Sequence, residues 1–419
     1  MSTRRRRVLV QLDNLELGGA QINAVQLSAA VAEHGYDSLV IGPADTLPAG
    51  PSVLDVSADY GVTARTYERP ASLFAHARVL SRLARGAHLV HAFSTSERAA
   101  YWGPALLGRR GLVRTIYEMS FDPRTHPSIP LVIGTGYLRD ELAGRPGGTT
   151  LVSPPVDTSR DAPGSTDRAA FRRELGLADD AVVLTIVSRL TEEMKARGVE
   201  DAIHAVERLG DPRVHLVVAG TGDAAARLRA VADGVNLRLG RTAVLFVGPL
   251  ADPRPAYDGA DVVLGMGSSA ARGLAFGKPL VVLGERGWSA VFREPYVDAI
   301  FRNSFWSPRE VADGAGLLAG HLRTLAADAA ERHRLGTAAR AFAEANFGLP
   351  AMAERLAGVY DEALRTASSR RWLRDLGTER RILAAKLGGG SGALEWKQRD
   401  TEAVGAREPE PATTEGAVR

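Results

Sequence analysis

A loop rich in glycine and serine, placed between two apolar runs, is the segment of this chain best suited to bind an anion. The first run ends at Leu264, and the loop after it supplies Gly265, Gly267, Ser268 and Ser269. Free backbone N–H groups at a helix N-terminus bind anions, and Arg272 adds a cation in the opening part of the predicted helix. An ordinary N-cap would explain one of the serines but not the whole cluster. The segment therefore predicts an anion-binding loop.

Two cationic side chains follow another apolar run, Val182–Val187. Arg189 and Lys195 would lie at the carboxyl end of this strand, where open parallel sheets bind their ligands. Such a pair suits a diphosphate and can stabilise negative charge on a leaving group. Two solvated surface charges are the alternative, and Arg197 competes with Lys195 for the role. Because the chain contains only four lysines, Lys195 favours the binding role.

Glycine turns follow two further predicted strands. Gly18 and Gly19 come after Val8–Leu12, and Gly220 comes after Val214–Ala219. Glycine lets a phosphate or a sugar approach the backbone closely. A plain strand-to-helix turn is the alternative for both glycine turns and explains each of them at least as well. No G-x-G-x-x-G follows the first strand, so the dinucleotide fingerprint is absent.

Two titratable residues close strands in the first half of the chain. His91 is predicted at the end of the strand His88–Ala92, and Glu118 follows Leu112–Ile116. At the carboxyl edge of a sheet either side chain could contact a substrate, and the carboxylate could bind a sugar hydroxyl or act as a base. A structural histidine is the alternative for His91.

The elements that would position these residues form two series of strands alternating with helices. Apolar strands alternating with helices indicate parallel sheets covered on both faces, so two series predict two doubly wound α/β domains. The predicted strands are Val8–Leu12, Ser38–Ile41, His88–Ala92, Leu112–Ile116 and Leu131–Ile133, then Val182–Val187, Val214–Ala219, Val244–Val247, Val262–Leu264 and Pro279–Leu283.

A proline-rich stretch from 153 to 164 separates the two series and reads as an extended linker. We expect a first domain over residues 1–155 and a second over 156–347. An amphipathic helix, Ala351–Arg365, is predicted to follow. The Gly-rich and then charged tail, 388–419, reads as disordered.

Composition excludes several classes of protein. The net charge of +3 gives no strong case for nucleic acid, and the absence of cysteine excludes disulfides and thiolate chemistry. No apolar run reaches the ~18 residues of a membrane span, and the apolar stretch after Arg4–Arg7 is too short for a secretory signal. We expect a soluble cytoplasmic protein, and the preference for Ala, Gly and Arg over Lys suggests a GC-rich bacterial genome.

Taken together, these motifs resemble the retaining glycosyltransferases of family four, which have the GT-B fold. The resemblance covers roughly residues 7–365. It rests on Gly18-Gly19-Ala20-Gln21, Ser188-Arg189-Leu190 with Lys195 and Gly198-Val199, Ala219-Gly220-Thr-Gly222, Phe246-Val-Gly248, Tyr257-Asp-Gly-Ala-Asp261-Val262, and Gly277-Lys-Pro279-Leu-Val-Val282.

The resemblance implies two Rossmann-like domains with a cleft between them. A nucleotide-diphosphate-sugar donor would bind mainly to the second domain and an acceptor to the first, and the helical segment after Phe347, about 348–387, would return to the first domain. Arg189 and Lys195 match the pair that binds the donor diphosphate as it leaves, and Gly18 and Gly19 match the phosphate-proximal loop. The resemblance implies no cofactor and no metal, because the cations do the work of a metal.

The chain departs from the family at its pair of glutamates. The second glutamate, which holds the nucleotide ribose, aligns with Arg272, and the residue eight positions earlier is Leu264, inside a strand. A guanidinium only donates hydrogen bonds, so it cannot replace a carboxylate that accepts them. Arg272 could bind the donor phosphate, could recognise an acidic sugar or acceptor, or could mark lost activity.

Three functions remain open: a glycosyltransferase, a catalytically inactive homologue that acts as a binding or assembly partner, and a sugar-nucleotide epimerase. The helical pattern 369–387 combines basic and apolar residues. It predicts either a helix packed on the first domain or on another subunit, or a peripheral contact with an anionic membrane. The sugar, the base, the acceptor and the oligomeric state are not specified by these patterns.

Overall fold

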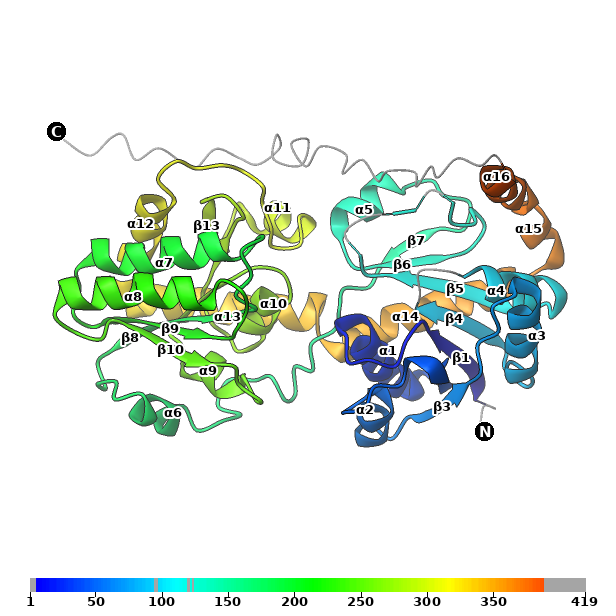
Figure 1. Ribbon diagram of the computed structural model, residues 1–419, viewed down its shortest axis with the longest axis horizontal. Helices are drawn as coiled ribbons and strands as arrows, with labels where there is room; N and C mark the ends of the chain where they lie inside the picture. The colour runs from blue at the N-terminus through cyan, green and yellow to red at the C-terminus, as the bar shows by residue number, and fades with distance from the viewer. Residues whose placement is uncertain (1–4, 94–96, 119–120, 123, 388–419) are drawn as a thin grey trace. The chain divides into compact units, whose positions relative to one another are not determined.

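Two α/β units make up the chain (Figure 1). The computed structural model describes residues 5–93, 97–118, 121–122 and 124–387. The first unit contains the described residues up to Asp157 together with those from Ala345 onward, and the second spans Thr158–Glu344. The sequence placed these boundaries at 155/156 and 347/348. The predicted disorder of 388–419 concerns residues outside the described part of the chain.

The first unit is built on a parallel sheet of seven strands in the order β3-β2-β1-β4-β5-β6-β7. Its strands are β1 (Arg6–Leu12), β2 (Tyr36–Pro43), β3 (Thr63–Tyr67), β4 (Leu89–Phe93), β5 (Gly111–Ile116), β6 (Leu131–Ile133) and β7 (Thr149–Leu151). Its helices are α1 (Gly19–Ala30), α2 (Val53–Asp59), α3 (Leu73–Leu83), α4 (Arg98–Ala100), η3 (Tyr101–Leu107), α5 (Gly136–Glu141), α14 (Leu349–Thr366), α15 (Ser369–Leu373) and α16 (Leu376–Leu387), with short turns η1 (Val31–His34) and η2 (Ala44–Thr46).

The second unit carries six strands in the order β10-β9-β8-β11-β12-β13, and only the edge strand β13 is antiparallel. The strands are β8 (Val182–Val187), β9 (Val214–Ala219), β10 (Val244–Gly248), β11 (Val262–Gly265), β12 (Leu280–Leu283) and β13 (Ser289–Val291). The helices are α6 (Arg168–Glu174), α7 (Ala196–Leu209), α8 (Ala225–Leu239), α9 (Arg254–Gly259), α10 (Ser268–Ala275), α11 (Val297–Arg302), α12 (Gly314–Ala327) and α13 (Ala329–Asn346).

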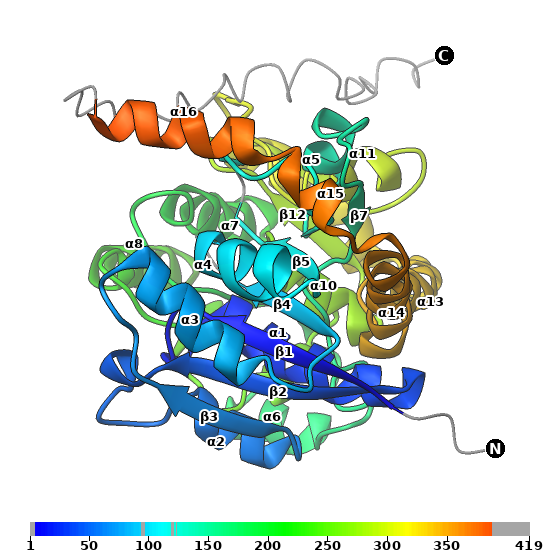
Figure 2. The same cartoon turned by 90° about the vertical axis from the view of Figure 1, so that its right-hand side faces the viewer.

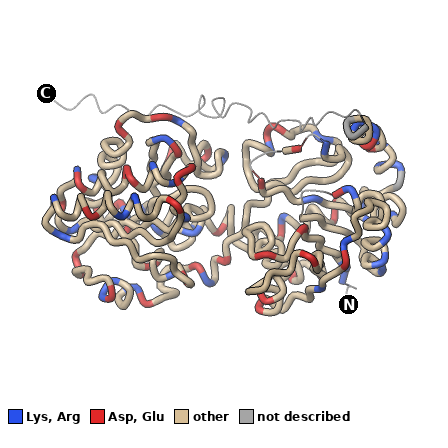
Figure 3. The backbone as a smooth tube through the Cα atoms, in the orientation of Figure 1, with Lys and Arg blue, Asp and Glu red and all other residues tan. Residues whose placement is uncertain are grey.

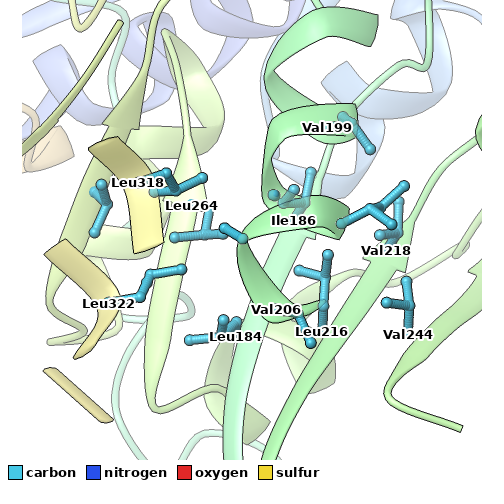
Figure 4. Packing of buried hydrophobic residues seen from close by; sticks show 14 of the residues in the cluster. Leu184, Ile186, Val199, Val206, Leu216, Val218, Val244, Leu264, Leu318 and Leu322 are labelled. Carbon is cyan, nitrogen blue, oxygen red and sulfur yellow. The ribbon is translucent and has the colours of Figure 1, made fainter. Parts of the chain in front are cut away.

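The core of the second unit lies between its sheet and the helices α7, α8 and α12 (Figure 4). The strands are buried on both faces, which is why they read as continuous apolar runs. Leu264, eight residues before Arg272, is fully buried in β11 and belongs to this core. The buried strands hold the loops at their carboxyl ends in fixed positions.

Helix α14 packs on the sheet of the first unit, as the resemblance implied for the returning helix. Its face of Met352, Leu356, Val359 and Tyr360 is buried in the same core as β1, β4 and β5. Regular apolar spacing along this helix predicted the buried face. Both parallel-sheet units agree with the predicted fold class.

The helical segment α15–α16 also packs on the first unit, where α15 contacts η3 and Arg98 of α4 donates a hydrogen bond to Glu379 of α16 (Figure 2). Trp372 is 1% exposed, and the Tyr101 hydroxyl donates a hydrogen bond of 2.7 Å to its carbonyl oxygen. Ile382 is buried as well. Two of the apolar residues that suggested a membrane-facing side are therefore buried, whereas Leu373 and Leu383 are exposed.

Candidate functional site

The order of strands in the second unit identifies one place for a ligand. From β8 the sheet continues through β9 and β10 on one side and through β11 and β12 on the other. The loops after β8 and β11 therefore leave the sheet in opposite directions, and open α/β sheets bind ligands at such a switch point. Arg189 lies on the first loop, and Gly267, Ser268 and Ser269 lie on the second.

The cationic pair sits between β8 and the start of α7. Arg189 is exposed, and Lys195 is half-buried directly before the first helical residue. Neither side chain has an acidic partner among the residues that the structure describes. Burial, followed by the positive charge of Arg189, lowers the pKa of the Lys195 ammonium group to about 8. Two converging cations without a counter-charge form a site that an anion would complete.

Arg197 no longer competes with Lys195. Its Nε donates to both carboxylate oxygens of Asp201 at 3.1 Å, one turn further along α7. A guanidinium engaged in an i,i+4 ion pair is a surface charge with its own partner. Lys195 thus has no acidic partner among the described residues, whereas Arg197, two residues later, is paired with Asp201.

The loop that carries the pair is anchored by residues that sequence reasoning missed. The Asp223 carboxylate accepts a hydrogen bond of 3.1 Å from the Glu192 N–H, and Arg227 bridges Glu192 and Glu200 at 2.9 and 2.8 Å. These contacts join the loop to α7 and α8. No local pattern marks Arg227, because its partners lie 35 and 27 residues away in sequence.

Gly220 has a structural role that differs from the predicted one. Its φ is +141°, and a Cβ there would lie 1.8 Å from the Ser188 carbonyl oxygen. Its N–H donates to the Gly248 carbonyl oxygen at 2.8 Å, so this group is not available to a phosphate. Glycine is needed here because the loop after β9 touches the loop that carries Arg189. Gly220 therefore acts by letting the loop after β9 pack closely against the loop that carries Arg189.

The loop after β11 offers the predicted helix N-terminus. Gly267 adopts φ +58° and ψ −132° immediately before α10, and no side chain caps the helix. The Ser269 hydroxyl donates back to the Met266 carbonyl oxygen at 3.0 Å, so it does not satisfy the first-turn N–H groups. The N–H groups of the first helical turn have no acceptor within a helix. Gly267, Ser268 and Ser269 therefore lie where an anion could bind.

Arg272 is committed to a partner inside its own unit. Its Nε forms an ion pair of 2.8 Å with the Asp161 carboxylate, which is 7% exposed. Each group of this ion pair supplies the counter-charge of the other, so neither the guanidinium nor the buried carboxylate needs a ligand to balance its charge. Arg272 is therefore a structural bridge to the 158–164 segment in the absence of donor, and its predicted contact with the donor stays a prediction.

The first unit has its own switch point between β1 and β4. Gly18 precedes α1 with extended φ and ψ, no side chain caps this helix, and Gly19 is its first residue. The Gln21 amide nitrogen donates to the Asn14 side chain at 3.1 Å, and a Cβ on Gly18 would lie 2.3 Å from the Gln21 Oε1 atom. Glycine at position 18 leaves room for the Gln21 side chain, and the predicted contact of Gly18 and Gly19 with a ligand stays a prediction. Residues 94–96, which follow β4, are outside the described residues.

The prediction that His91 lies at a strand end facing a ligand is wrong. His91 is in the middle of β4 and is fully buried. Its ring nitrogens lie 2.7 Å from the hydroxyls of Tyr360 and Thr115, and burial lowers its pKa to about 3. With both nitrogens engaged and no exposed surface, the ring cannot exchange a proton with a substrate. Its partner Tyr360 comes from α14, 269 residues later, so no local pattern could show the pairing.

Glu118 lies where it was expected. It is exposed, two residues after β5, and no hydrogen bond or ion pair of its side chain occurs within the described ranges. It remains a candidate contact at the carboxyl edge of the first sheet. Its role is a prediction.

Searches for other kinds of site give two negative findings. Within the described ranges, no group of three or more His, Asp and Glu side chains is placed to hold a metal ion. No helix of the described chain is both long and apolar enough to span a bilayer.

Known proteins resemble this chain in both sequence and fold. Residues 181–313 match the family model described as glycosyl transferases group 1. The D-inositol 3-phosphate glycosyltransferase of Geodermatophilus obscurus is 39% identical over 111 residues, which cover 24% of each protein. The chain thus aligns with about a quarter of that curated relative's length.

Solved structures share the fold over most of the chain. Anabaena HepE in complex with UDP has a TM-score of 0.65 at 17% identity and covers 85% of this chain and all of its own. The same Anabaena protein has also been solved with UDP-glucose. A glycosyltransferase from Rickettsia africae has a TM-score of 0.66 at 14% identity over 87% of this chain and all of its own. At these identities the likeness establishes the GT-B fold.

Proposed function

We propose that this protein, whose residues 181–313 form a group 1 glycosyltransferase domain within a GT-B fold, transfers a sugar from a nucleotide-diphosphate-sugar donor to an acceptor. Retention of configuration, independence of metal and a cytoplasmic location are parts of the same proposal. The observation that carries it is the pair Arg189 and Lys195, which lies beside the switch point of the second sheet and has no acidic partner within the described part of the chain. Anabaena HepE, with the same fold, binds UDP and UDP-glucose.

The chemistry follows from the charges of this pair. When the bond between the anomeric carbon and the diphosphate oxygen breaks, the electron pair remains on the diphosphate. Two fixed cations beside that oxygen stabilise the charge as it develops and need little reorganisation. The start of α10 adds N–H donors of the same polarity at Ser268 and Ser269, whereas the Gly267 N–H donates to the Phe305 carbonyl oxygen at 3.4 Å. The acceptor hydroxyl forms the new bond and loses its proton, for which Glu118 is the candidate base.

Nucleotide binding tests the proposal most directly. We expect UDP, GDP or dTDP at millimolar concentration to raise the melting temperature, and Arg189→Ala to weaken binding by about tenfold to a hundredfold, the effect of one charge-assisted contact. Arg197→Ala serves as the matched control because Arg197 is paired with Asp201. If none of the three nucleotides shifts the melting temperature, the proposal fails.

Product analysis tests the finer parts. Incubation with UDP-glucose and simple acceptors, followed by NMR of the product's anomeric centre, should show the donor's configuration retained. Activity should survive EDTA, because Arg189 and Lys195 supply the positive charge. An inverted product would overturn retention, and loss of activity restored by a divalent cation would overturn metal independence.

A catalytically inactive homologue is the second candidate, and Arg272 is the observation that favours it. The ion pair with Asp161 places a cation at the position expected to supply a carboxylate for the ribose. We expect Arg272→Glu to strengthen nucleotide binding if the ribose lacks a partner, although it also leaves Asp161 without its cation. Asp161→Asn alone controls for that loss. Hydrolysis or transfer of a donor sugar by the wild-type protein would exclude this candidate.

A peripheral membrane contact through α15–α16 is a further prediction. Leu373 and Leu383 are 51% and 56% exposed, with Arg370, Arg374, Arg380 and Arg381 exposed beside them. Flotation with anionic liposomes should be reduced by Leu373→Ser with Leu383→Ser, a pair of changes that leaves buried Trp372 in place. Equal flotation of wild type and variant would remove this contact.

A further inference from the structure

A basic pocket lies in the first unit, within the amino-terminal part of its sheet and apart from the loops described above. It has a volume of about 360 Å³ and is lined by Arg5, Arg7, Asp37, Gly86, His88 and Arg110. These residues begin or precede β1, β2, β4 and β5. Figure 3 shows basic segments beside the N-terminal end of the trace. The proposed transfer reaction uses none of these residues.

The charges of the pocket are not balanced. Asp37 pairs with Arg5 at 2.9 Å, whereas Arg7 and Arg110 have no acidic partner in the described part of the chain. Three guanidinium groups against one carboxylate give a net charge of +2 within one small volume. Like charges that converge without a counter-ion repel one another, so a bound anion would stabilise this arrangement.

The floor of the pocket is held by the backbone. The Arg7 N–H donates to the His88 Nδ1 atom at 3.0 Å, and the His88 N–H donates to the Arg7 carbonyl oxygen at 2.8 Å. The Gly111 N–H donates to the His88 carbonyl oxygen at 3.2 Å. His88 therefore ties the starts of β1, β4 and β5 together. A side chain fixed in this way costs little entropy when a ligand binds.

The same contacts fix the hydrogen-bonding role of His88. Because Nδ1 accepts from a backbone N–H, the proton of the neutral ring is on Nε2. The imidazole thus presents a donor, and the guanidinium groups can only donate. Gly86, with φ +83°, has no side chain, and a Cβ there would lie 3.5 Å from the Arg7 Nη1 atom. Donors on several sides of an open floor suit a ligand rich in acceptor oxygens.

We propose that this pocket binds a phosphate group carried by a small molecule or a lipid headgroup. A phosphomonoester carries a charge of about −1.5 to −2 at neutral pH, which matches the net charge of the pocket, and its oxygens fit the planar guanidinium fork. The Asp37 carboxylate remains an acceptor for a hydroxyl group on the same ligand. The volume is at the lower end of the range for small-molecule sites, which is about 300–1,000 Å³.

The test uses the full chain with Arg189→Ala and Lys195→Ala, so that phosphate cannot report on the donor site. Inorganic phosphate and glycerol 3-phosphate are titrated by calorimetry at constant ionic strength, because screening weakens exposed charges. We expect saturable binding that Arg7→Gln with Arg110→Gln weakens at least tenfold. The control, Arg78→Gln with Arg82→Gln, removes the same charge from exposed positions of the first unit outside the pocket, and we expect it to change the Kd less than twofold.

A lipid arm separates the two sources of phosphate. Co-sedimentation with vesicles of phosphatidylcholine containing phosphatidic acid is compared with phosphatidylcholine alone for the same three proteins: the Arg189/Lys195 background, the Arg7/Arg110 pair and the Arg78/Arg82 control pair. Binding to these vesicles without binding to the soluble phosphates assigns a headgroup, and the reverse assigns a soluble ligand. If neither binds, or if the control pair weakens binding as much as the Arg7 and Arg110 pair, the proposed site is wrong. Circular dichroism and the melting temperature confirm that each variant is folded.

Discussion

Each unit contains a group of charged residues around one side chain whose pKa is shifted, Lys195 in the second unit and His126 in the first, and the two groups differ in whether their charges are paired. In the second unit the exposed Arg189 and the half-buried Lys195 have no acidic partner among the described residues. In the first unit His126 is fully buried between two carboxylates, with Nδ1 2.8 Å from Glu97 and Nε2 2.9 Å from Glu379. Charges without an acidic partner at the end of a strand indicate a binding site, and we call Arg189 and Lys195 the open pair. Charges that are paired and buried, as around His126, indicate a structural role.

We call His126, Glu97, Arg114 and Glu379 the closed group. Because Glu379 belongs to α16, this group holds that helix on the first unit. Arg114 pairs with Glu97 at 2.7 Å, and Tyr101 stacks on the His126 ring with 4.0 Å between centroids. Burial alone would raise the pKa values of Glu97 and Glu379. Their hydrogen bonds to His126 and the charges of nearby arginines lower both to about 2. A strongly shifted pKa therefore does not by itself mark catalysis in this protein.

The largest effect should come from breaking the closed group. Glu97→Gln removes the charge that Arg114 and His126 share and leaves buried cations without their partner. We expect a loss of about 3–5 kcal/mol from the stability of the first unit, the usual cost of breaking a buried ion pair. Scanning calorimetry would follow the transition of this unit.

An exposed pair provides the control for that measurement. Asp45 lies 3.0 Å from Arg69, and both side chains are at least 36% exposed. Asp45→Asn should cost no more than about 1 kcal/mol. Equal losses from the two substitutions would mean that the buried group contributes no more than a surface pair.

Breaking the open pair should affect turnover more than folding. Lys195→Ala should reduce kcat for sugar transfer by about 10²–10³-fold, the size expected when one donor to a developing anion is removed. Because Lys195 has no partner to lose, the melting temperature should stay within a few degrees or rise. Arg197→Ala is the control, since its guanidinium is engaged by Asp201. A similar loss from both variants would show that the free lysine has no special role.

The same lysine should give nucleotide binding a dependence on pH. Its lowered pKa, about 8, makes the ammonium group lose its proton as pH rises through that value. The affinity for UDP should therefore be constant near pH 7 and fall by up to about tenfold per unit above pH 8. Lys195→Arg should remove this fall, because a guanidinium stays protonated. A fall that persists in this variant would assign the titration to another group.

The sequence predicted the buried parts of the fold better than the edges. The bounds of β8 and β9 agree with the predicted runs, because strands covered on both faces are continuously apolar. The strands β3, β7 and β13 were missed, and each lies at the edge of its sheet. β3 reads Thr-Ala-Arg-Thr-Tyr and is largely exposed, so hydrophobicity does not mark it.

The candidate site was predictable where position along a strand decides it. Arg189 and Lys195 follow β8 in the second sheet, and Glu118 follows β5 in the first. Within each sheet the carboxyl ends of the parallel strands lie at the same edge. Partners distant in sequence could not be predicted, which is why His91 was misplaced and why the pairing of Arg272 with Asp161 was not foreseen. The closed group also escaped detection, since its members come from four distant parts of the chain.

The smallest expected effect is the pH dependence of the closed group. Burial alone would lower the pKa of His126, but its hydrogen bonds to Glu379 and Glu97 outweigh burial and raise it. A raised folded-state pKa contributes stability that is complete below the unfolded value of about 6.5 and is lost as pH rises through the folded value. The stability of the first unit should thus decline on the alkaline side of neutrality, by less than Glu97→Gln costs.

His126→Gln isolates this effect from the other groups that face the ring. Glu97 and Glu379 are already ionised in this pH range, because their pKa values are about 2, and the pKa of Arg145, which burial lowers to about 10, still lies above it. Asp375, whose pKa burial raises, is the remaining carboxyl group near the ring, and Asp375→Asn tests it separately. The histidine variant should show a flat profile over the window in which the wild type declines. If the two profiles fall in parallel, the charge on His126 does not hold α16 in place, and the comparison with the open pair would then rest on geometry alone.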